Sequence, residues 1–242
     1  MTPQPAAIPV HLAEPDRPFW GYAELLVAAG IFLVATIIGF MAMKSLGGAM
    51  HFDPELGVPL LIVEFTAYAV VFLALKALFA RYGEPLFESL GWVAYPFRPH
   101  QLVVLGIALA IVVVLLGALL RLPNVETPFD KLLSDLPSRI AISAFGTTLG
   151  PVIEELLFRG FLQPLLVESF GVLPGILATS VVFGAMHLMQ NANLWQSGVL
   201  ITFVGFVLGV VRHVSGSTRA SAITHVSYNA LPFLLTLIFG GK

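Results

Sequence analysis

Cysteine is absent from this chain of 242 residues. Its absence excludes structural disulfides, a cysteine nucleophile and zinc sites built from thiolates. It also removes the usual redox clue to the compartment in which a protein works. Any catalytic or binding chemistry must therefore come from carboxylates, histidines and other polar side chains.

Charged residues are also scarce. Asp, Glu, Lys and Arg make up 11% of the chain, whereas an average soluble domain has about 25%. Hydrophobic residues make up 57%, and the mean hydropathy is +0.92. So few charges cannot cover a globule in water, and the composition predicts a membrane protein. The formal net charge of −2 argues against a nucleic-acid partner.

The N-terminal segment, residues 1–18, contains five prolines and few residues that could pack. We predict a disordered tail. A signal peptide is not expected, because the basic start and the short apolar core are missing.

Long apolar runs dominate the rest of the chain. A membrane-spanning helix needs about 20 mostly apolar residues, and helices are expected because lipid offers no partner to backbone polar groups. The sequence predicts an all-α polytopic helix bundle with about seven transmembrane helices, or eight. We divide it into the tail, N-terminal helices with interfacial connections over 19–138, and a helical core over 139–240. The expected spans are residues 20–43, 58–79, 102–120, 139–166, 173–189, 194–211 and 220–239.

The connection over residues 121–139 is long enough to form structure of its own. Phe129, Leu132, Leu133 and Leu136 recur at helical spacing, which predicts a short amphipathic helix on the membrane surface. We interpret it as a plain surface connection, with a substrate gate as the alternative. Lys and Arg are split almost evenly between the two sides, so the membrane orientation stays open.

The stretch "PVIEELLFRGF", residues 151–161, places Glu154, Glu155 and Arg159 inside an apolar run. Each charge at the centre of a membrane helix costs about 2.5–3.5 kcal/mol. Glu155 and Arg159 are four residues apart, with the acid first, which favours an ion pair. Glu154 projects about 100° away from Glu155 and is left free for another role. A buried cluster that only locks the helix is the alternative.

Other polar groups lie deep in the later spans. "FGAMH" places His187 near the end of the fifth span, and "HVSYN" places His225 and Asn229 on one face of the seventh. Together with Glu154 they supply a base, a second proton carrier and hydrogen-bond donors, as needed to activate water and stabilise an oxyanion. We expect Glu154 to lie within about 8 Å of His187 or His225. Glu64 is a weaker candidate for the same cavity.

The three motifs EExxxR, FxxxH and HxxxN occur in that order, as Glu154–Arg159, Phe183–His187 and His225–Asn229. In this the chain resembles the CPBP family of intramembrane proteases, also called the Abi family, which includes the type II CAAX prenyl endopeptidases. The resemblance covers about residues 139–239; residues 1–138 contribute only generic spans.

The resemblance implies a membrane-embedded peptidase, in the plasma membrane of a prokaryote, that cleaves a peptide or protein substrate, which can be prenylated or membrane-associated. It implies that Glu154 and His187 activate water and that His225 and Asn229 stabilise the oxyanion. Glu155, Arg159 and Phe183 would support the site.

Two matters stay open at this point. The family is often labelled a metalloprotease, and Glu154, His187 and His225 could form a His₂Glu zinc set, but the HExxH helix of ordinary zinc peptidases is missing. We favour a metal-free site slightly. The competing functions are a proton-coupled transporter and a non-catalytic membrane scaffold that retains the motifs.

Overall fold

The computed structural model describes residues 18–53, 55, 57–123 and 125–239. The predicted N-terminal tail lies outside these residues except for Pro18. The described residues form helices and connections without a strand, so the predicted all-α fold class is confirmed. The elements are α1 (Tyr22–Met50), α2 (Gly57–Tyr82), α3 (Leu86–Ser89), α4 (Pro99–Leu119), α5 (Pro128–Leu132), α6 (Leu136–Thr147), α7 (Leu149–Glu155), the π-helix η1 (Leu156–Leu162), α8 (Gln163–Phe170), α9 (Val172–Met186), α10 (Trp195–Ser215) and α11 (Thr218–Phe239).

Each of the expected spans coincides with a helix or a run of helices, and the protein is a multi-pass membrane protein. Among the described residues, α1, α2, α4 and α10 are long and apolar enough to cross a membrane by length and composition, and the bent run from α6 to α8 adds a fifth. This number is smaller than the expected seven or eight. With 15 residues, α9 extends only about 22 Å, less than a hydrocarbon core of about 30 Å. In α11, the first turns are rich in polar residues.

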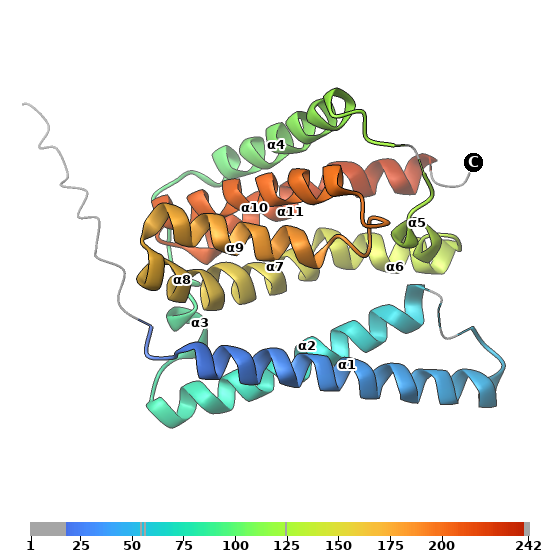
Figure 1. Ribbon diagram of the computed structural model, residues 1–242, viewed down its shortest axis with the longest axis horizontal. Coiled ribbons are helices and arrows are strands. Elements are labelled where there is room, and N and C mark those ends of the chain that lie inside the picture. Colours follow the sequence, from blue (N-terminus) through green and yellow to red (C-terminus); the bar gives the residue numbers. More distant parts are fainter. Residues whose placement is uncertain (1–17, 54, 56, 124, 240–242) are drawn as a thin grey trace, which may run out of the picture.

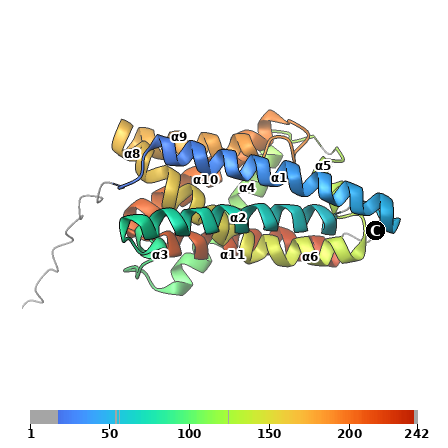
Figure 2. The same cartoon turned by 90° about the horizontal axis from the view of Figure 1, so that it is seen from below.

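The helices are arranged around the run from α6 to α8 (Figures 1 and 2). The hairpin of α1 and α2 lies on one side of the bundle, and α4 lies on the opposite side against α11. Between them, α9 and α10 pack on each other and on the segment that carries the EExxxR motif. The three motifs therefore meet in the middle of the bundle.

The break between α6 and α7 has a local cause. Pro151 has no N–H to donate to the carbonyl of Thr147. The hydroxyls of Thr147 and Thr148 donate instead to the carbonyls of Ser143 and Ala144, both at 2.6 Å. The helix bends by 41° here, and the last turn of α6 keeps carbonyl groups free for other partners.

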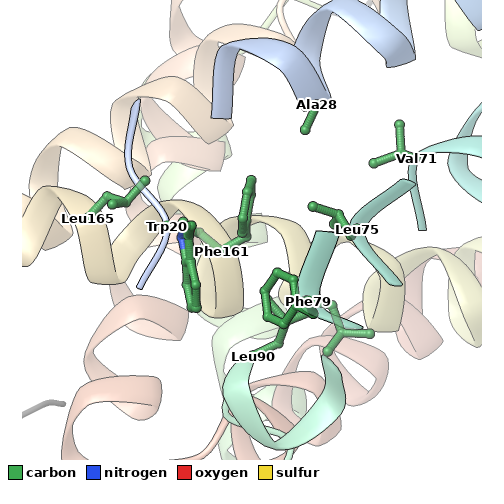
Figure 3. Close-up of a cluster of buried hydrophobic side chains, with 9 residues drawn as sticks. Trp20, Ala28, Val71, Leu75, Phe79, Leu90, Phe161 and Leu165 are labelled. Carbon is green, nitrogen blue, oxygen red and sulfur yellow. The ribbon is translucent and has the colours of Figure 1, made fainter. Parts of the chain in front are cut away.

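An aromatic cluster fixes the N-terminal hairpin to the motif-bearing segment (Figure 3). Trp20 stacks on Phe161 of η1 with ring centroids 5.4 Å apart, and its Nε1 donates to the Phe161 carbonyl at 3.0 Å. Phe79 of α2 packs against Trp20 at 5.2 Å. Buried aromatic pairs of this kind contribute about 0.5–1.5 kcal/mol beyond their buried area, so the cluster sets the position of α2 beside the site.

The predicted amphipathic helix over 121–139 is divided in two. Thr127 caps α5 by accepting a hydrogen bond from the Asp130 N–H at 3.1 Å. The chain then turns, and Asp135 caps α6 in the same way through the Ser138 N–H at 2.9 Å. Leu133 is buried, whereas Leu136 is exposed. The expected apolar face is therefore not continuous, because two capped helix starts interrupt it.

Gly106 allows α4 to approach α11 closely, and we predict that Gly106→Ala destabilises the protein. A Cβ at this position would lie 2.3 Å from the Thr224 carbonyl oxygen and 2.7 Å from the Ser227 Cβ. Overpacking of this kind costs about 1–3 kcal/mol. Thermal unfolding in detergent micelles should show a lower Tm. Gly30→Ala, in the interior of α1 with nothing within 4 Å of the added Cβ, is the control and should keep or raise the Tm. Equal Tm values for the two variants would contradict the prediction.

Candidate active site

One cavity of about 380 Å³ is lined by residues from all three motifs. Glu154 comes from α7, His187 from the end of α9, and His225 and Asn229 from α11. Glu64 of α2 also lines the cavity. The fold thus brings together all four residues that the sequence selected for chemistry, and it adds the weaker candidate.

Glu154 faces both histidines. Its Oε1 lies 3.9 Å from His187 Nε2, and its Oε2 lies 3.8 Å from His225 Nε2. Both distances are well inside the expected limit of about 8 Å. The side chains of Glu154 and His187 are 21% and 23% exposed, whereas His225 is 4% exposed. Glu154 and His187 are therefore more accessible from the cavity than His225, which also lines it.

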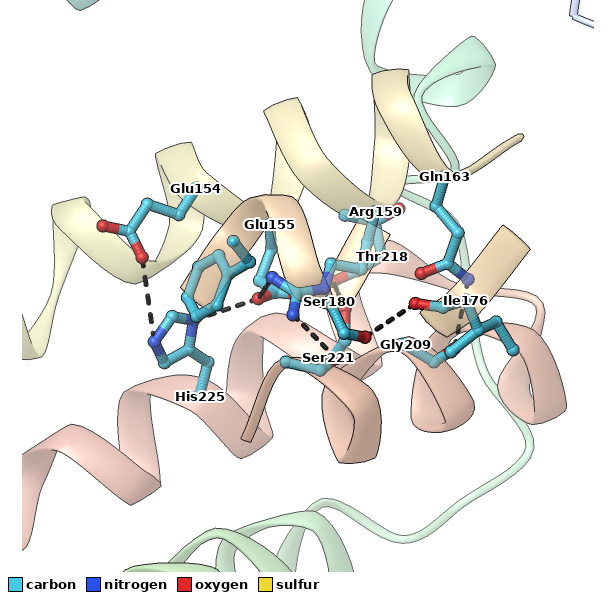
Figure 4. A network of polar contacts seen from close by, with 12 residues as sticks. Glu154, Glu155, Arg159, Gln163, Ile176, Ser180, Gly209, Thr218, Ser221 and His225 are labelled. Atoms are coloured by element: carbon cyan, nitrogen blue, oxygen red, sulfur yellow. Dashed lines mark hydrogen bonds and ion pairs between the residues drawn. The ribbon is translucent and has the colours of Figure 1, made fainter. Parts of the chain in front are cut away.

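Glu155 points away from the cavity into a buried ion pair (Figure 4). Its Oε1 accepts a hydrogen bond from Arg159 Nη1 at 2.8 Å, and both side chains are 0% exposed. Arg159 Nη2 donates to the Gly205 carbonyl of α10 at 2.9 Å. The predicted pairing of Glu155 with Arg159 is confirmed, and it leaves Glu154 as the carboxylate without this partner.

Arg159 lies in the π-helical segment η1 rather than in a regular α-helix. π-helical turns are rare and occur frequently at functional sites. The segment was expected to be α-helical throughout, and its apolar sequence gives no sign of the wider turn. Arg159 still pairs with Glu155, four residues earlier in the chain. Glu155 is the last residue of α7, and the π-helix begins directly after it.

His225 is oriented by the buried carboxylate. Its Nδ1 lies 3.0 Å from Glu155 Oε1, and because a carboxylate accepts, Nδ1 carries the proton. The other ring nitrogen, Nε2, faces Glu154. In the doubly protonated form, Nε2 also becomes a donor directed at the cavity. Glu155 therefore fixes which nitrogen of His225 meets a bound molecule.

His187 is held at the C-cap of α9. Its Nδ1 donates to the Phe183 carbonyl at 2.8 Å, since a carbonyl can only accept. The Asn191 side chain donates to the His187 carbonyl at 2.9 Å and closes the turn after the helix. In the neutral ring Nε2 is then an acceptor on the side of Glu154, which is the form that can take a proton.

Phe183 forms the apolar floor beneath these groups. Its ring centroid lies 4.6 Å from that of His187 and 5.0 Å from that of Phe158. The Arg159 guanidinium stands over the same ring at 4.5 Å, within the range of a cation–π interaction. Phe183 is 2% exposed, so it separates the ion pair from the cavity.

Asn229 is positioned by the break in the first motif helix. Its Nδ2 donates to the Gly146 carbonyl at 2.8 Å, in the last turn of α6 where carbonyls lack helical partners. An amide nitrogen has two N–H groups, so one remains for a bound molecule. No sequence pattern pointed to this partner, because Gly146 belongs to no motif.

The walls of the cavity include residues that the motifs do not contain. Phe129 of α5 lines it, and the Phe129 N–H donates to the Gln190 carbonyl at 3.1 Å. The Phe129 ring packs against Phe233 of α11 with centroids 6.1 Å apart. The connection over 121–139 is therefore part of the cavity wall. We interpreted its sequence as a plain surface connection. The amphipathic spacing of its apolar residues was the signal that it packs against the bundle.

Glu154, His187 and His225 are the donors that the sequence proposed for a zinc site. Zinc is held by His and carboxylate atoms at about 2.0–2.2 Å. In the part of the chain that the structure describes, no group of three or more His, Cys, Asp or Glu residues is arranged to hold a metal ion. Chelation of the purified protein distinguishes a His₂Glu zinc site from a metal-free one. The arrangement offers a carboxylate between two imidazoles, with amide and imidazole donors on one side, which suits general base chemistry.

Comparison with known proteins agrees with this geometry. Residues 135–231 match the family model "type II CAAX prenyl endopeptidase Rce1-like". A search among curated proteins and a search among solved structures each gave no match. The matched segment begins at the N-cap of α6 and ends within α11, and it contains the three motifs. Residues 135–231 of this chain are therefore similar to the type II CAAX prenyl endopeptidase Rce1-like family.

Proposed function

We propose that the protein is an intramembrane endopeptidase in which Glu154 and His187 activate the attacking water. The observation that carries the proposal is the position of Glu154, which lies 3.9 Å from His187 and 3.8 Å from His225 in a cavity inside the bundle. The match to a family of membrane proteases supports the reaction class.

In the proposed reaction, Glu154 takes a proton from water while the water oxygen forms a bond to the scissile carbonyl carbon. His187 Nε2 assists as the second acceptor. The negative charge on the carbonyl oxygen receives hydrogen bonds from Asn229 Nδ2 and from His225 Nε2 in its doubly protonated form. The C–N bond then breaks, and the leaving nitrogen takes the proton back from Glu154. Glu155, Arg159 and Phe183 hold the two imidazoles in place.

The proposed substrate is a peptide that carries a prenylated cysteine, as the name of the matching family implies. We place the enzyme in the cell membrane of a prokaryote on the basis of the resemblance alone. Cleavage by purified protein in lipid nanodiscs tests the function, with a quenched fluorogenic peptide prepared with and without a farnesyl group. Cleavage that is lost in Glu154→Gln supports the proposal, whereas absence of cleavage of both peptides would overturn it.

We propose that catalysis does not need a metal, and we predict that chelation leaves the activity unchanged. Water activation then depends on Glu154 and His187 alone, so protein treated with a chelator should keep its kcat. Elemental analysis of the active fraction should find much less than one zinc per chain. Activity that disappears with the chelator, returns with zinc and follows a content of about one zinc per chain would replace this version with the His₂Glu site.

A further inference from the structure

Glu64 is a carboxylate of the cavity wall that the proposed reaction does not use. It lies in α2, two turns after the helix begins, and it lines the same cavity as the motif residues. It is half-buried, and its side chain is hydrogen-bonded to that of Tyr68, one turn later. A carboxylate offers about four acceptor positions, so this bond leaves most of them free.

The charge of Glu64 is not balanced by a permanent cation. Arg159 is buried against Glu155 behind Phe183. Among the described residues that line the cavity there is no Lys or Arg, and His187 is the group of opposite potential charge that interacts with Glu64. An ionisable side chain at membrane depth is costly and marks a functional site by default. The cavity therefore contains the carboxyl groups of Glu64 and Glu154 without a permanent cation among its described lining residues, and a cationic ligand can pair with them.

Glu64 lies between the polar cavity and a second, apolar groove. Leu60 and Glu64 line the polar cavity, and they also line an apolar groove of about 430 Å³ between α1 and α2. Phe32 and Phe40 of α1 form part of the groove wall. The carboxylate thus lies where an apolar surface open to lipid meets the polar site. A group that binds there needs a positive charge attached to an apolar stem, as in Lys and Arg.

We propose that Glu64 is a specificity-determining residue that binds a Lys or Arg side chain of the peptide substrate close to the bond that is cleaved. This inference rests on the proposed peptidase function and adds a preference that the three motifs do not contain. The hydrogen bond to Tyr68 restricts the positions that the carboxylate can take. A charge-assisted hydrogen bond in such a site is stronger than one to a neutral amide, so a basic residue is preferred over a neutral one of similar length.

Matched peptides test the proposal. The peptide cleaved by the wild-type protein is prepared with Lys or Gln at each position within three residues of the cleaved bond, and kcat/KM is measured for each pair. At one position the Lys peptide should be better by about tenfold or more. In Glu64→Gln this ratio should fall to near one. In Glu64→Lys a peptide with Glu at that position should become better than the Lys peptide.

Two control variants separate this role from general effects of charge or folding. Thr66→Ala changes an exposed residue of the same helix, and Glu88→Gln removes an exposed carboxylate of α3; both should keep the wild-type ratio. A wild-type enzyme that cleaves in a Glu154-dependent manner without any Lys preference would overturn the inference and leave the peptidase function intact. So would a Glu64→Gln variant that retains the preference.

If no peptide is cleaved, the proposed function fails, and binding decides the inference separately. Fluorescence anisotropy then compares the Kd of the labelled Lys and Gln peptides for the wild-type protein and for Glu64→Gln in nanodiscs. Tighter binding of the Lys peptide that disappears in Glu64→Gln supports the carboxylate site. Equal Kd values for the two peptides on the wild-type protein would overturn it.

Discussion

Glu154→Gln is expected to cleave substrate about 10² to 10⁴ times more slowly than the wild-type protein. The change keeps the shape of the side chain and removes the proton acceptor that faces His187 and His225 at 3.9 and 3.8 Å. The Glu154 side chain is 21% exposed and is not part of the buried ion pair with Arg159. The free energy of unfolding should therefore change little. The Tm in micelles should stay close to that of the wild-type protein.

Single-turnover rates with the fluorogenic peptide check this expectation, and thermal unfolding of the same preparation checks the fold. Glu168→Gln, which changes a carboxylate of α8 that does not line the cavity, serves as the matched control and should cleave normally. Normal cleavage by Glu154→Gln would remove Glu154 from the role of base.

Glu155→Gln is expected to lose stability together with activity. Glu155 and Arg159 are both 0% exposed, and their ion pair is 2.8 Å long. Removing one partner of a buried pair costs about 3–5 kcal/mol, because the other charge stays buried without compensation. His225 also loses the carboxylate that orients its Nδ1 at 3.0 Å. Expression level and Tm should therefore fall, and cleavage should fall with them.

The double variant Glu155→Gln with Arg159→Met should recover part of the lost Tm, because no lone charge remains in the bundle. The recovery stays partial, since the Gly205 carbonyl loses the hydrogen bond from Arg159 at 2.9 Å. Activity should not return, because His225 still lacks its anionic partner. A Glu155→Gln variant that is as stable as the wild-type protein yet inactive would exchange the roles of the two glutamates.

Local features of the sequence were enough to predict the helices and to predict that Glu155, rather than Glu154, pairs with Arg159. Apolar runs longer than about 20 residues require helices in lipid, and each of these runs is helical in the structure. A spacing of four residues places Glu155 against Arg159 through the geometry of one helix, and the pair forms at 2.8 Å. These relations act within a few residues of the chain, where backbone geometry alone determines which side chains meet.

Hydrogen bonds between residues that are distant in the chain could not be predicted from the sequence, because they depend on how the helices pack. The hydrogen bond of Asn229 to Gly146 joins residues 83 positions apart, and that of His225 to Glu155 joins residues 70 apart. The first exists because the bend before α7 leaves carbonyls of α6 free. The approach of α2, set by the cluster of Trp20, Phe79 and Phe161, decides that Glu64 lines the cavity.

By itself, the sequence determined an all-α membrane protein and which residues carry the carboxylate, the two imidazoles and the amide of the candidate site, because composition and motif spacing are properties of the chain. The motifs also predicted one shared site, with Glu64 as a weaker candidate for it. Only the tertiary structure decided that η1 is a π-helix and that Phe129 belongs to the cavity wall. The physical reason is that helix positions in the bundle follow from side-chain packing and from the hydrogen bonds of broken helix ends, which are summed over many distant residues.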